Sequence, residues 1–598
     1  MNSRPAAPPA EDPLQQALAL HREGKRGLAM QRYVAILERD PTHADALYYV
    51  AVLALQEGQF AEGIKVIERA LKVGPERGRL YNLLGQAHMR LNDDAEALRC
   101  FERAIACEPG FADAYGNRAN LLADMGRREE ALAAFDQALL LRPDNAEDHC
   151  NRASVLADLG RTAEALAGYD RAIALFPELA PAHFNRADVL MRLGRLEEAL
   201  AAYDRTLALE PELAAAHSNR GIVLKELGRL DEARASADRA LAIDPGFAEA
   251  YVNRGNVAFE LGRLEDAQAD YVRALERRPE LPAARYARGL AFLAQGDWPS
   301  GFPLYDEREN IAAAPYKPLP YPRWRGEPMP GERLVLLCEQ GLGDTIQFCR
   351  FGPYLAARGL PVTLLASAPM RPLLSTLRGV SVATSPDELA SDRRPLRWLP
   401  LMSAPGVLGL RPDTVPAEVP YLAADPARIE GWRRRLGPQG FKIGINWAPG
   451  PTRGWFGRRR AIPLAMFALL AALPGVRLIS LQTETGLDEI AQVPFRDRIE
   501  RPAIDSEPGA GRFVDTAALM ASLDLIVTCD TSIAHLAGAL ARPVFTALPH
   551  VPDWRWLRER EDCPWYPTMR LFRQRAPGDW REVFGRIAQA VSELSDRR

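Results

Sequence analysis

The chain has 598 residues, of which 47% are hydrophobic and 26% are charged, and its formal net charge is −3. This length exceeds that of a single domain, and the composition is that of an ordinary folded protein rather than a fibre or a disordered chain. The near-balance of charge gives no overall field that would attract nucleic acid or an anionic membrane, and no window of about 18 uncharged apolar residues predicts a membrane span.

The seven cysteines show neither a Cys-X-X-Cys pair nor the spacing of a disulfide framework. Reduced, buried thiols are therefore expected. The first residues, MNSRPAAPPAEDP, lack the apolar core of a signal peptide. We predict that residues 1–9 are disordered and that the protein is cytoplasmic.

Two residue types recur with a period of 34 residues through the first half of the chain. The prolines are Pro41, Pro75, Pro109, Pro143, Pro177, Pro211, Pro245 and Pro279. The glycines are Gly24, Gly58, Gly126, Gly160, Gly194, Gly228, Gly262 and Gly296, with Asn92 in the one remaining position. Asn tolerates a left-handed turn almost as Gly does, so the second series predicts a tight turn in every repeat.

Amphipathic, Ala-rich stretches fill the intervals, such as FADAYGNRANLLADMG before a turn and EEALAAFDQALLLRP after one. Each repeat is therefore predicted to be a helix, a turn, a second helix and a proline stop. A column of small residues would let the two helices approach closely: Gly85, Ala119, Ala153, Ala187, Gly221, Gly255 and Gly289.

With aromatics in a further column, at Phe135, Tyr169, Tyr203 and Tyr271, this pattern resembles the tetratricopeptide repeat. The resemblance covers residues 10–312, about nine helical hairpins. It implies an α-solenoid that buries its core between neighbouring repeats and presents a long concave surface to a protein or peptide partner.

One asparagine column lies in the first helix of five successive repeats: Asn117, Asn151, Asn185, Asn219 and Asn253. A side-chain amide both donates and accepts hydrogen bonds, so this column predicts a ladder that binds the main chain of an extended peptide. It resembles the asparagine ladder of the O-GlcNAc transferase solenoid. The alternative is that Asn is simply frequent at this position in such repeats.

The neighbouring arginine column, Arg118, Arg152, Arg186, Arg220, Arg254 and Arg288, repeats in step with Asp136, Asp170, Asp204 and Asp238. Arginines in this register could bind acidic partners. The matching aspartates instead favour an internal ladder of Arg and Asp pairs.

The repeat register ends after Asn310, and residues 313–330 form a Pro-rich connector. A second architecture is predicted over residues 331–598. Its first half, residues 331–430, begins with the strand RLVLLCEQ, the turn GLGD, the helix TIQFCRFGPYLAARG and the strand PVTLLAS. Short apolar strands between amphipathic helices predict a parallel, doubly wound sheet.

A similar series occupies residues 441–598. Its predicted strands are FKIGINW, VRLISLQ, DLIVTCD and RPVFTAL, and its predicted helices include DTAALMASL and TSIAHLAGAL. Two Rossmann-like halves that face a cleft are the inference. Ligands of such sheets bind beyond the carboxyl ends of the strands, so we look for chemistry in the strand-to-helix loops.

Two of those loops carry residues suited to a ligand. In EQGLGDTIQFCRF, Gly341 and Gly343 permit a tight turn and Asp344 lies at the predicted N-cap of a helix. In TCDTSIAHLAGAL, Asp530, Thr531 and Ser532 follow a buried strand and begin a helix. Free backbone N–H groups, the helix dipole and two hydroxyls make the second loop a predicted diphosphate site.

These loops, together with PDWRWL, CPWYPTMRLFRQ and the closing Asp579 and Trp580, resemble a bacterial family. Its members join tetratricopeptide repeats to a glycosyltransferase-like domain related to the heptosyltransferases and, more distantly, to O-GlcNAc transferase. The resemblance implies the two-Rossmann "B" type of glycosyltransferase fold. It also implies a metal-independent enzyme that binds a nucleotide diphosphate sugar mainly through its C-terminal half.

By this resemblance Asp530, Thr531, Ser532 and His535 match the donor-binding segment, with Gly341 and Gly343 on the facing loop. Asp344 matches the carboxylate proposed as general base, which would take the proton of the acceptor hydroxyl. The leaving diphosphate needs positive charge in place of a metal, and Arg459, within the run Arg458 to Arg460, is the predicted source.

Each assignment has a structural alternative. Asp344 and Asp530 could be ordinary helix caps, His535 a core histidine on a Leu- and Ala-rich helix face, and the arginine run a solvated loop. The tryptophans near the C-terminus could stack on a base or sugar, but packing is the simpler interpretation.

The sequence therefore predicts a metal-independent, inverting glycosyltransferase. It would move a sugar from a nucleotide diphosphate donor to an acceptor recruited by the repeats, plausibly a protein hydroxyl. The alternative is a scaffold whose transferase-like domain has lost catalysis, which the fold by itself would not distinguish from an enzyme.

Overall fold

The structure is a computed structural model that describes residues 12–73, 77–311, 316–390, 392, 394–450, 455–504 and 511–597. The predicted disorder of residues 1–9 lies outside these residues. The chain forms two compact units, Met1–Pro211 and Glu212–Arg598. The division falls inside the repeats rather than at the Pro-rich connector.

Unit 1 consists of paired antiparallel helices in its described residues. They are α1 (Pro13–Arg22), α2 (Arg26–Arg39), α3 (Ala44–Gln56), α4 (Phe60–Val73), α5 (Arg77–Arg90), α6 (Asp94–Cys107), α7 (Ala112–Asp124), α8 (Arg128–Leu141), α9 (Ala146–Asp158), α10 (Thr162–Leu175), α11 (Ala180–Arg192) and α12 (Leu196–Leu209). Consecutive odd and even helices pack against each other, as the 34-residue period predicts.

The turn column has the backbone conformation that its residue types predict. The eight repeat glycines have φ between 74° and 85°, and Asn92 has φ of 60°. Residues other than Gly and Asn rarely adopt this left-handed conformation. The predicted turn within each hairpin is therefore confirmed.

The Arg and Asp columns pair with each other. In unit 1 Arg152 donates to Asp136 at 2.7 Å, and Arg186 donates to Asp170 at 2.7 Å. In unit 2 Arg254 donates to Asp238 at 2.8 Å and to Asp270 at 2.6 Å. The internal ladder favoured by the sequence is confirmed at these positions.

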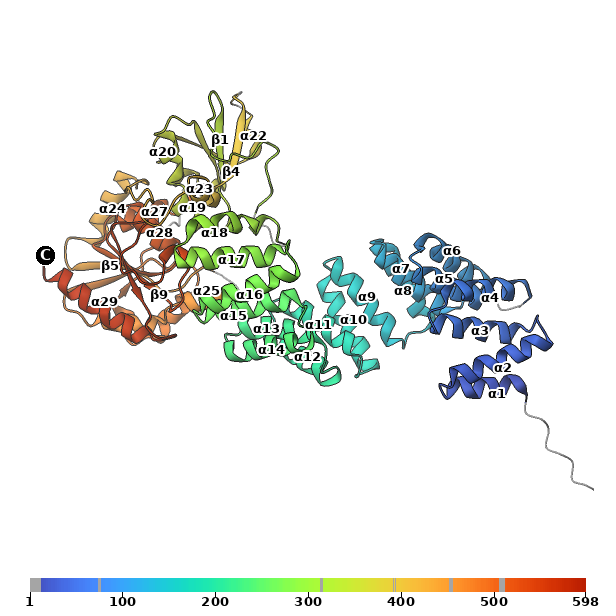
Figure 1. Cartoon of the computed structure of the whole chain (residues 1–598). Helices are drawn as coiled ribbons and strands as arrows, with labels where there is room; N and C mark the ends of the chain where they lie inside the picture. Colours follow the sequence, from blue (N-terminus) through green and yellow to red (C-terminus); the bar gives the residue numbers. More distant parts are fainter. Residues whose placement is uncertain are drawn as a thin grey trace, which may run out of the picture. The chain divides into compact units, whose positions relative to one another are not determined.

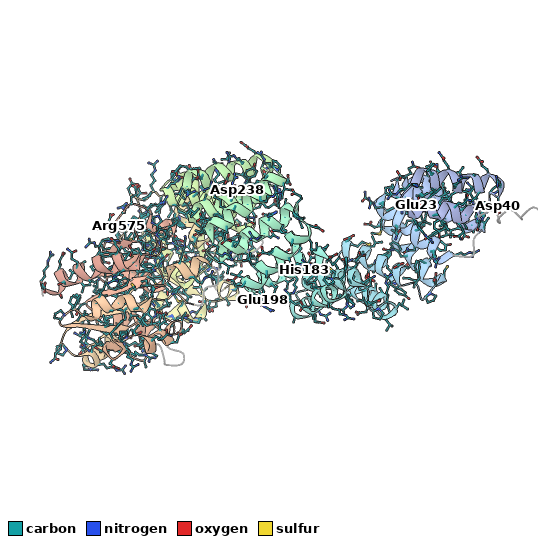
Figure 2. All side chains as sticks on the ribbon, turned by 90° about the horizontal axis from the view of Figure 1, so that it is seen from below. Glu23, Asp40, His183, Glu198, Asp238 and Arg575 are labelled. Atoms are coloured by element: carbon teal, nitrogen blue, oxygen red, sulfur yellow. The ribbon has the colours of Figure 1, made fainter. Side chains whose placement is uncertain are left out.

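Other polar side chains of unit 1 also bond within their own repeats. His183 of α11 donates through Nε2 to the carbonyl oxygen of Pro177 at 3.0 Å. Glu198 of α12 pairs with Arg195 at 2.7 Å. Figure 2 labels both residues on the repeats.

Unit 2 begins with the remaining repeats. Their helices are α13 (Ala214–Glu226), α14 (Leu230–Ile243), α15 (Ala248–Glu260), α16 (Leu264–Arg277), α17 (Pro282–Gln295) and α18 (Trp298–Tyr305), followed by the short helix η1 (Asp306–Glu309). A Cβ atom at Gly255 would lie 2.6 Å from the Tyr271 ring, and one at Gly289 would lie 2.8 Å from the Tyr305 backbone nitrogen. The predicted close approach at the small-residue column is thus confirmed.

The first half of the α/β region contains a four-stranded parallel sheet with strand order β3-β2-β1-β4. Its strands are β1 (Arg333–Leu337), β2 (Val362–Leu365), β3 (Val380–Ala383) and β4 (Leu396–Pro400). Its helices are α19 (Leu342–Phe348), α20 (Phe351–Ala356), α21 (Arg371–Leu374), α22 (Pro386–Leu389) and α23 (Ala404–Val407). The single helix predicted after β1 is in fact two short helices.

The second half contains a six-stranded parallel sheet with strand order β10-β9-β8-β5-β6-β7. Its strands are β5 (Phe441–Asn446), β6 (Val476–Ser480), β7 (Ile499–Glu500), β8 (Leu525–Cys529), β9 (Val544–Leu548) and β10 (Met569–Arg573). The helices are α24 (Pro426–Leu436), α25 (Trp455–Arg460), α26 (Ala468–Ala471), α27 (Val514–Met520), α28 (Ser532–Ala539) and α29 (Trp580–Ser595), with the short helix η7 (Trp554–Trp556). The two predicted parallel sheets are confirmed.

One hydrophobic core joins the last repeat to both sheets. Trp298 and Phe302 of α18 belong to the same buried cluster as Leu336 of β1 and Ile526 of β8. Helix α18 accordingly contacts α23, and α17 contacts η7 (Figure 1). The final repeats are therefore part of the same folded body as the α/β region.

Candidate functional site

Unit 2 contains a cavity of about 1120 Å³. Its lining includes the loops that follow β1, β5, β6 and β8, and it also includes side chains of the repeat helices α13, α15 and α17. The carboxyl ends of parallel strands are the usual place for ligands in sheets of this type. The prediction that the two strand-to-helix loops would face a common space therefore agrees with the position of the cavity.

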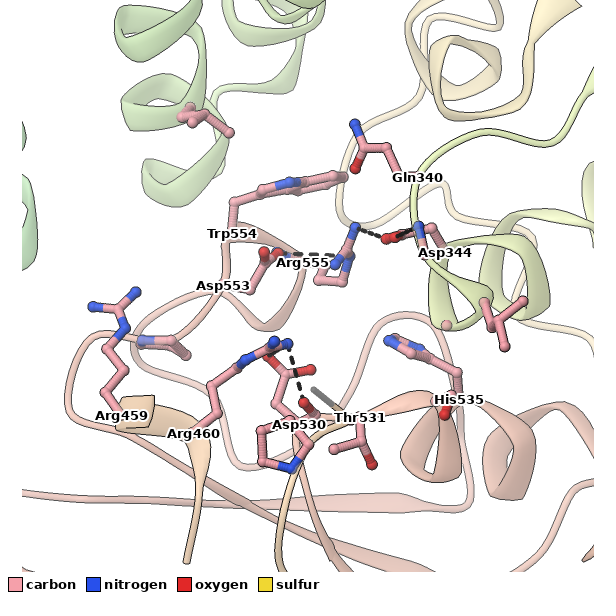
Figure 3. A pocket seen from close by; sticks show the side chains of 18 of the residues that line it. Gln340, Asp344, Arg459, Arg460, Asp530, Thr531, His535, Asp553, Trp554 and Arg555 are labelled. Carbon is pink, nitrogen blue, oxygen red and sulfur yellow. Dashed lines mark hydrogen bonds and ion pairs between the residues drawn. The ribbon is translucent and has the colours of Figure 1, made fainter. Parts of the chain in front are cut away.

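The loop after β1 holds Asp344 in the first turn of α19. The predicted N-cap position of Asp344 is wrong, because Gly341 is the N-cap and Asp344 is the third residue of the helix. Gln340 has φ of 59°, and this left-handed residue turns the chain into the helix. The Gly341 N–H donates to Asp344 Oδ2 at 2.8 Å, so one oxygen of the carboxylate caps the helix. The other oxygen, Oδ1, accepts from Arg555 Nη2 at 2.7 Å (Figure 3).

Arg555 is the central cation of the cavity. Its side chain is 10% exposed, and it also lies 3.5 Å from the Asp553 carboxylate. Burial opposes the charge of Arg555, but the Asp553 and Asp344 carboxylates outweigh it and raise the pKa of the guanidinium. Arg555 therefore stays charged and places positive charge beside the predicted base.

The loop after β8 places Asp530 in the floor of the cavity. Its side chain is 3% exposed, and Arg460 Nη1 lies 4.0 Å from Oδ2 and donates to the Asp530 carbonyl oxygen at 3.2 Å. Within the described residues, Asp530 Oδ2 has no hydrogen-bond partner. Burial raises the pKa of Asp530, and the nearby Arg460 partly offsets this effect.

Thr531 turns its hydroxyl toward the sheet. Thr531 Oγ1 donates to Asn446 Oδ1 at 2.8 Å, and Asn446 Nδ2 donates to Gln482 Oε1 at 2.6 Å. Asn446 ends β5 and Gln482 follows β6, so this network ties three strand ends together. Thr531 and the following Ser532 also line the cavity.

His535 lies one turn into α28 and is 3% exposed. Its Nδ1 is 3.1 Å from the Tyr566 hydroxyl, and its ring stacks on Trp556 at 5.2 Å. Burial, followed by the positive charge of Arg555, lowers the pKa of His535 well below 6.5. The imidazole is therefore neutral at physiological pH, and it both packs in the core and borders the cavity.

The two predicted loops contact each other. A Cβ atom at Gly343 would lie 3.2 Å from His535 Cδ2 and 3.4 Å from Ser532 Cα. Helices α19 and α28 are correspondingly in direct contact. Glycine at position 343 thus allows the two helix N-termini to meet at the cavity.

The three arginines of α25 contact two different regions, the repeats and the loop after β8. Arg459 forms an ion pair with Glu260 of α15, and Arg458 donates to the Glu226 carbonyl oxygen of α13. Arg460 instead approaches Asp530. Of the three, Arg459 and Arg460 line the cavity, so the predicted Arg459 borders the repeats and Arg460 is nearer the strand ends.

Sequence reasoning missed several cavity residues: Arg555, Asp553, Asn446, Gln482, Asn256 and Tyr286. The segment PDWRWL was noticed for its tryptophans, yet its arginine and aspartate carry the charge. Asn446 ends one buried strand and Gln482 follows another, which is a signal that the sequence did contain. Asn256 and Tyr286 lie in repeats, where nothing in the sequence predicts a contact with the α/β region.

The predicted asparagine column bonds between neighbouring repeats. In unit 1 Asn117, Asn151 and Asn185 donate through Nδ2 to Asn82, Asn120 and Ser154 at 2.9, 3.0 and 3.2 Å. In unit 2 Asn253 donates to Ser218 at 2.9 Å. Asn219 is also engaged. These contacts describe bridges along the solenoid, and the peptide-binding role of the column stays a prediction.

The described residues contain neither a cluster of metal ligands nor a membrane-spanning helix. No group of three or more His, Cys, Asp or Glu side chains is arranged to bind a metal ion among them. In the same parts of the chain, every helix is too short or too polar to cross a bilayer.

Comparison with known families identifies the repeats. Models of the tetratricopeptide repeat match residues 14–65, 51–112, 112–145, 184–246 and 252–318. Among curated proteins, the protein FlbA of Caulobacter vibrioides is 28% identical over 337 residues, which cover 53% of this chain and 56% of FlbA. The chain thus spans about half the length of this relative.

Solved structures of repeat proteins also match. The Cut9–Hcn1 hetero-tetramer of the APC/C is 19% identical, with a TM-score of 0.38, and the match covers 47% of this chain and 55% of that one. YrrB, described as a tetratricopeptide repeat protein with an unusual peptide-binding site, is 28% identical with a TM-score of 0.28, and the match covers 32% of this chain and 98% of YrrB. The matched residues are tetratricopeptide repeats, and the chain is homologous to FlbA over 337 residues. The repeats are followed by an α/β region with two parallel sheets.

Proposed function

We propose that the α/β region is a glycosyltransferase of the two-Rossmann "B" type, inverting and independent of a metal. It transfers a sugar from a nucleotide diphosphate donor to an acceptor that the repeats recruit, a protein hydroxyl. The observation that carries this proposal is the cavity at the carboxyl ends of strands from both sheets, with Asp344 on one loop and Asp530 with the α28 N-terminus on the other.

The roles follow from the charges around the cavity. The acceptor hydroxyl attacks the anomeric carbon and its proton passes to the Asp344 carboxylate. The bond between the anomeric carbon and the diphosphate oxygen breaks, and the diphosphate leaves with the electron pair. Arg460, Arg459 and the backbone N–H groups that begin α28 stabilise the negative charge on this leaving group.

One observation favours a non-catalytic scaffold instead. Several charged groups of the cavity already pair with one another, since Arg555 pairs with Asp344, and Arg459 pairs with Glu260. A cavity that has lost its ligand could keep such pairs for stability. Tetratricopeptide repeats bind proteins in either case, so the two functions differ only in whether a nucleotide binds.

Calorimetric titration of the full-length protein with ADP, GDP, UDP, CDP and dTDP distinguishes the transferase from the non-catalytic scaffold. We expect micromolar binding of one nucleotide and about tenfold weaker binding by Arg460→Gln, because a guanidinium beside the phosphates would be lost. Arg458→Gln is the matched control. The Arg458 side chain belongs to the same helix, but it is exposed and donates to the Glu226 carbonyl oxygen.

The corresponding sugar nucleotide then tests catalysis through release of the nucleoside diphosphate. Asp344→Asn should lower the turnover by about 10² or more, the usual contribution of a general base, while nucleotide binding persists. Absence of binding by all five nucleotides would refute the transferase and favour the scaffold.

A further inference from the structure

The two sides of the cavity differ in chemistry. The side built by the α/β region, which we call the charged floor, carries Asp344, Arg460, Asp530, Asp553 and Arg555. The uncharged part of the side built by the repeats, which we call the repeat wall, carries Val252, Asn256 and Phe259 of α15 and Ala283, Tyr286, Ala287 and Leu290 of α17. The charged repeat residues Lys225 and Glu260 also line the cavity, but the wall itself offers a diphosphate no charge.

The repeat wall is a continuous face of two helices. Residues 252, 256 and 259 are spaced by four and three positions, and residues 283, 286, 287 and 290 by three, one and three. These spacings place each set on one side of its helix. Both helices are the first helix of their repeat, so the same face of consecutive repeats borders the cavity.

The charged repeat residues at the border of the cavity are already paired. Glu260 forms an ion pair with Arg459, and Lys225 lies 3.0 Å from Glu226. Phe259, Tyr286 and Leu290 are only partly buried, although they pack against the main core. Three large side chains therefore leave apolar surface on the cavity side, where burial by a ligand would be favourable.

Tyr286 connects the wall to the charged floor through neighbouring aromatic rings. Its ring lies 5.6 Å from that of Tyr305, and the Tyr305 ring lies 6.2 Å from that of Trp554, the neighbour of Arg555. Tyr286, Trp554 and Asp344 all line the cavity. The wall and the predicted base thus border the same cavity.

Asn256 supplies the polar group of the wall. Its Oδ1 accepts from the Tyr271 hydroxyl at 3.0 Å. This bond fixes the orientation of the amide and leaves Nδ2 as a donor, which suits a backbone carbonyl of a bound segment.

We propose that the repeat wall is the acceptor subsite, and that it binds an uncharged polypeptide segment whose apolar side chains flank the reacting hydroxyl. This inference rests on the proposed function. A polypeptide is the fitting occupant because the wall belongs to tetratricopeptide repeats and joins apolar surface to a donor for a backbone carbonyl. Stacking of the nucleobase on Tyr286 is the competing assignment for the same surface.

Fluorescence polarisation with labelled peptides tests the proposal on the full-length protein. Each probe is a short peptide with one central serine, flanked by apolar, neutral polar, acidic or basic residues. We expect the apolar set to bind at least about tenfold more tightly than the acidic set. Equal binding of all four sets would overturn the proposal.

Two variants locate the binding. Asn256→Ala removes the donor, and Ala283→Trp fills the wall from an exposed position and so should leave the fold intact. Both should weaken binding of the apolar probe about tenfold. The controls are Asn120→Ala and Ala215→Trp, which make the same changes at the same places of other repeats, away from the cavity.

Nucleotide titration of these variants, and of a further variant Tyr286→Ala, separates the possible failures. If Ala283→Trp and Tyr286→Ala weaken nucleotide binding rather than peptide binding, the wall is a nucleobase site and this inference is wrong. If the nucleotide binds and peptide affinity does not respond to either wall variant, the inference fails while the proposed function stands. If no nucleotide binds to the wild type, the proposed function itself fails.

Discussion

The repeats before and after Pro211 share one sequence pattern but have different surroundings. In unit 1 the polar columns bond to neighbouring repeats, as Arg152 does to Asp136 and Asn151 does to Asn120. In unit 2 the same period continues, yet α15 and α17 also border a cavity and α18 enters the core of the α/β region. The repeat pattern determines the fold of each hairpin, whereas the neighbouring structure determines whether its outer face contacts solvent, the cavity or the α/β region.

The strongest test of this difference is truncation. A fragment of residues 212–598 should fold, whereas a fragment of residues 320–598, which begins after the repeats, should not. The shorter fragment loses Trp298, Phe302 and Tyr305, which are at most 3% exposed. Loss of one such aromatic side chain costs about 3–5 kcal/mol, and three exceed the stability of many domains.

Soluble yield and tryptophan fluorescence measure the outcome. All ten tryptophans lie at residue 298 or later, so their fluorescence reports on unit 2. We expect a cooperative unfolding transition for residues 212–598 and none for residues 320–598. A cooperative transition in the shorter fragment would show that the repeats are dispensable for the α/β fold.

The second prediction compares the stability lost when a buried ion pair is broken with that lost when an exposed ion pair is broken. Arg308 is 1% exposed and donates to Glu339 at 2.8 Å, while Arg152 is 27% exposed and donates to Asp136 at 2.7 Å. Arg308→Met leaves a buried carboxylate without its partner and should cost about 3–5 kcal/mol. Arg152→Met should cost about 1 kcal/mol or less.

The pH dependence of Arg308→Met provides an internal check. Burial raises the pKa of Glu339 and Arg308 opposes this effect, so removal of Arg308 raises that pKa further. Between 4.5, the ordinary pKa of this side chain, and the raised pKa, Glu339 of the folded variant keeps a proton that the unfolded chain has lost. The free energy of unfolding of the variant therefore falls as the pH rises through this range. The loss relative to wild type should be smaller at about pH 5 than at about pH 8.

Denaturation followed by far-UV circular dichroism measures both variants, and tryptophan fluorescence assigns the transition to unit 2. Equal losses for Arg308→Met and Arg152→Met would contradict the burial argument. A loss that does not change with pH would mean that Glu339 does not titrate as proposed.

The smallest effect concerns His535. Its folded pKa lies well below 6.5 because it is buried, so below that pH the unfolded chain binds a proton that the folded chain does not. Its contribution to stability is complete above about pH 6.5 and falls by at most about 1.4 kcal/mol per pH unit below it.

His535→Asn removes the titrating group and should reduce the slope of unit 2 stability against pH. Urea unfolding by tryptophan fluorescence at several values between pH 7 and pH 5 measures it. Identical slopes for the variant and the wild type would show that other groups account for the acid sensitivity.

The sequence predicted local structure well where residue type and period agree. The turn glycines, the small-residue column and the Arg and Asp ladder depend only on residues less than one repeat apart, and all are confirmed. The strands at Phe441–Asn446 and Leu525–Cys529 were also predicted, because short runs rich in β-branched residues alternate there with amphipathic helices. Short edge elements such as β7, with two residues, carry too little pattern to recognise.

The candidate site was predicted only in part. Asp344 and Asp530 were found because each lies where a helix follows a buried strand, and the structure brings both to one cavity. Arg555 was missed because its partner Asp344 is 211 residues away in the chain. Tyr286 was missed because its repeat looks like every other repeat.

The sequence by itself determined the hairpins, their turns and the parallel strands, since these depend on neighbours along the chain and on periodicity. Only the tertiary structure decided which repeats meet the α/β region, which arginine lies beside Asp344, and which helix faces line the cavity. Those choices depend on contacts between residues hundreds of positions apart, where burial and charge pairing, rather than local pattern, select the partner.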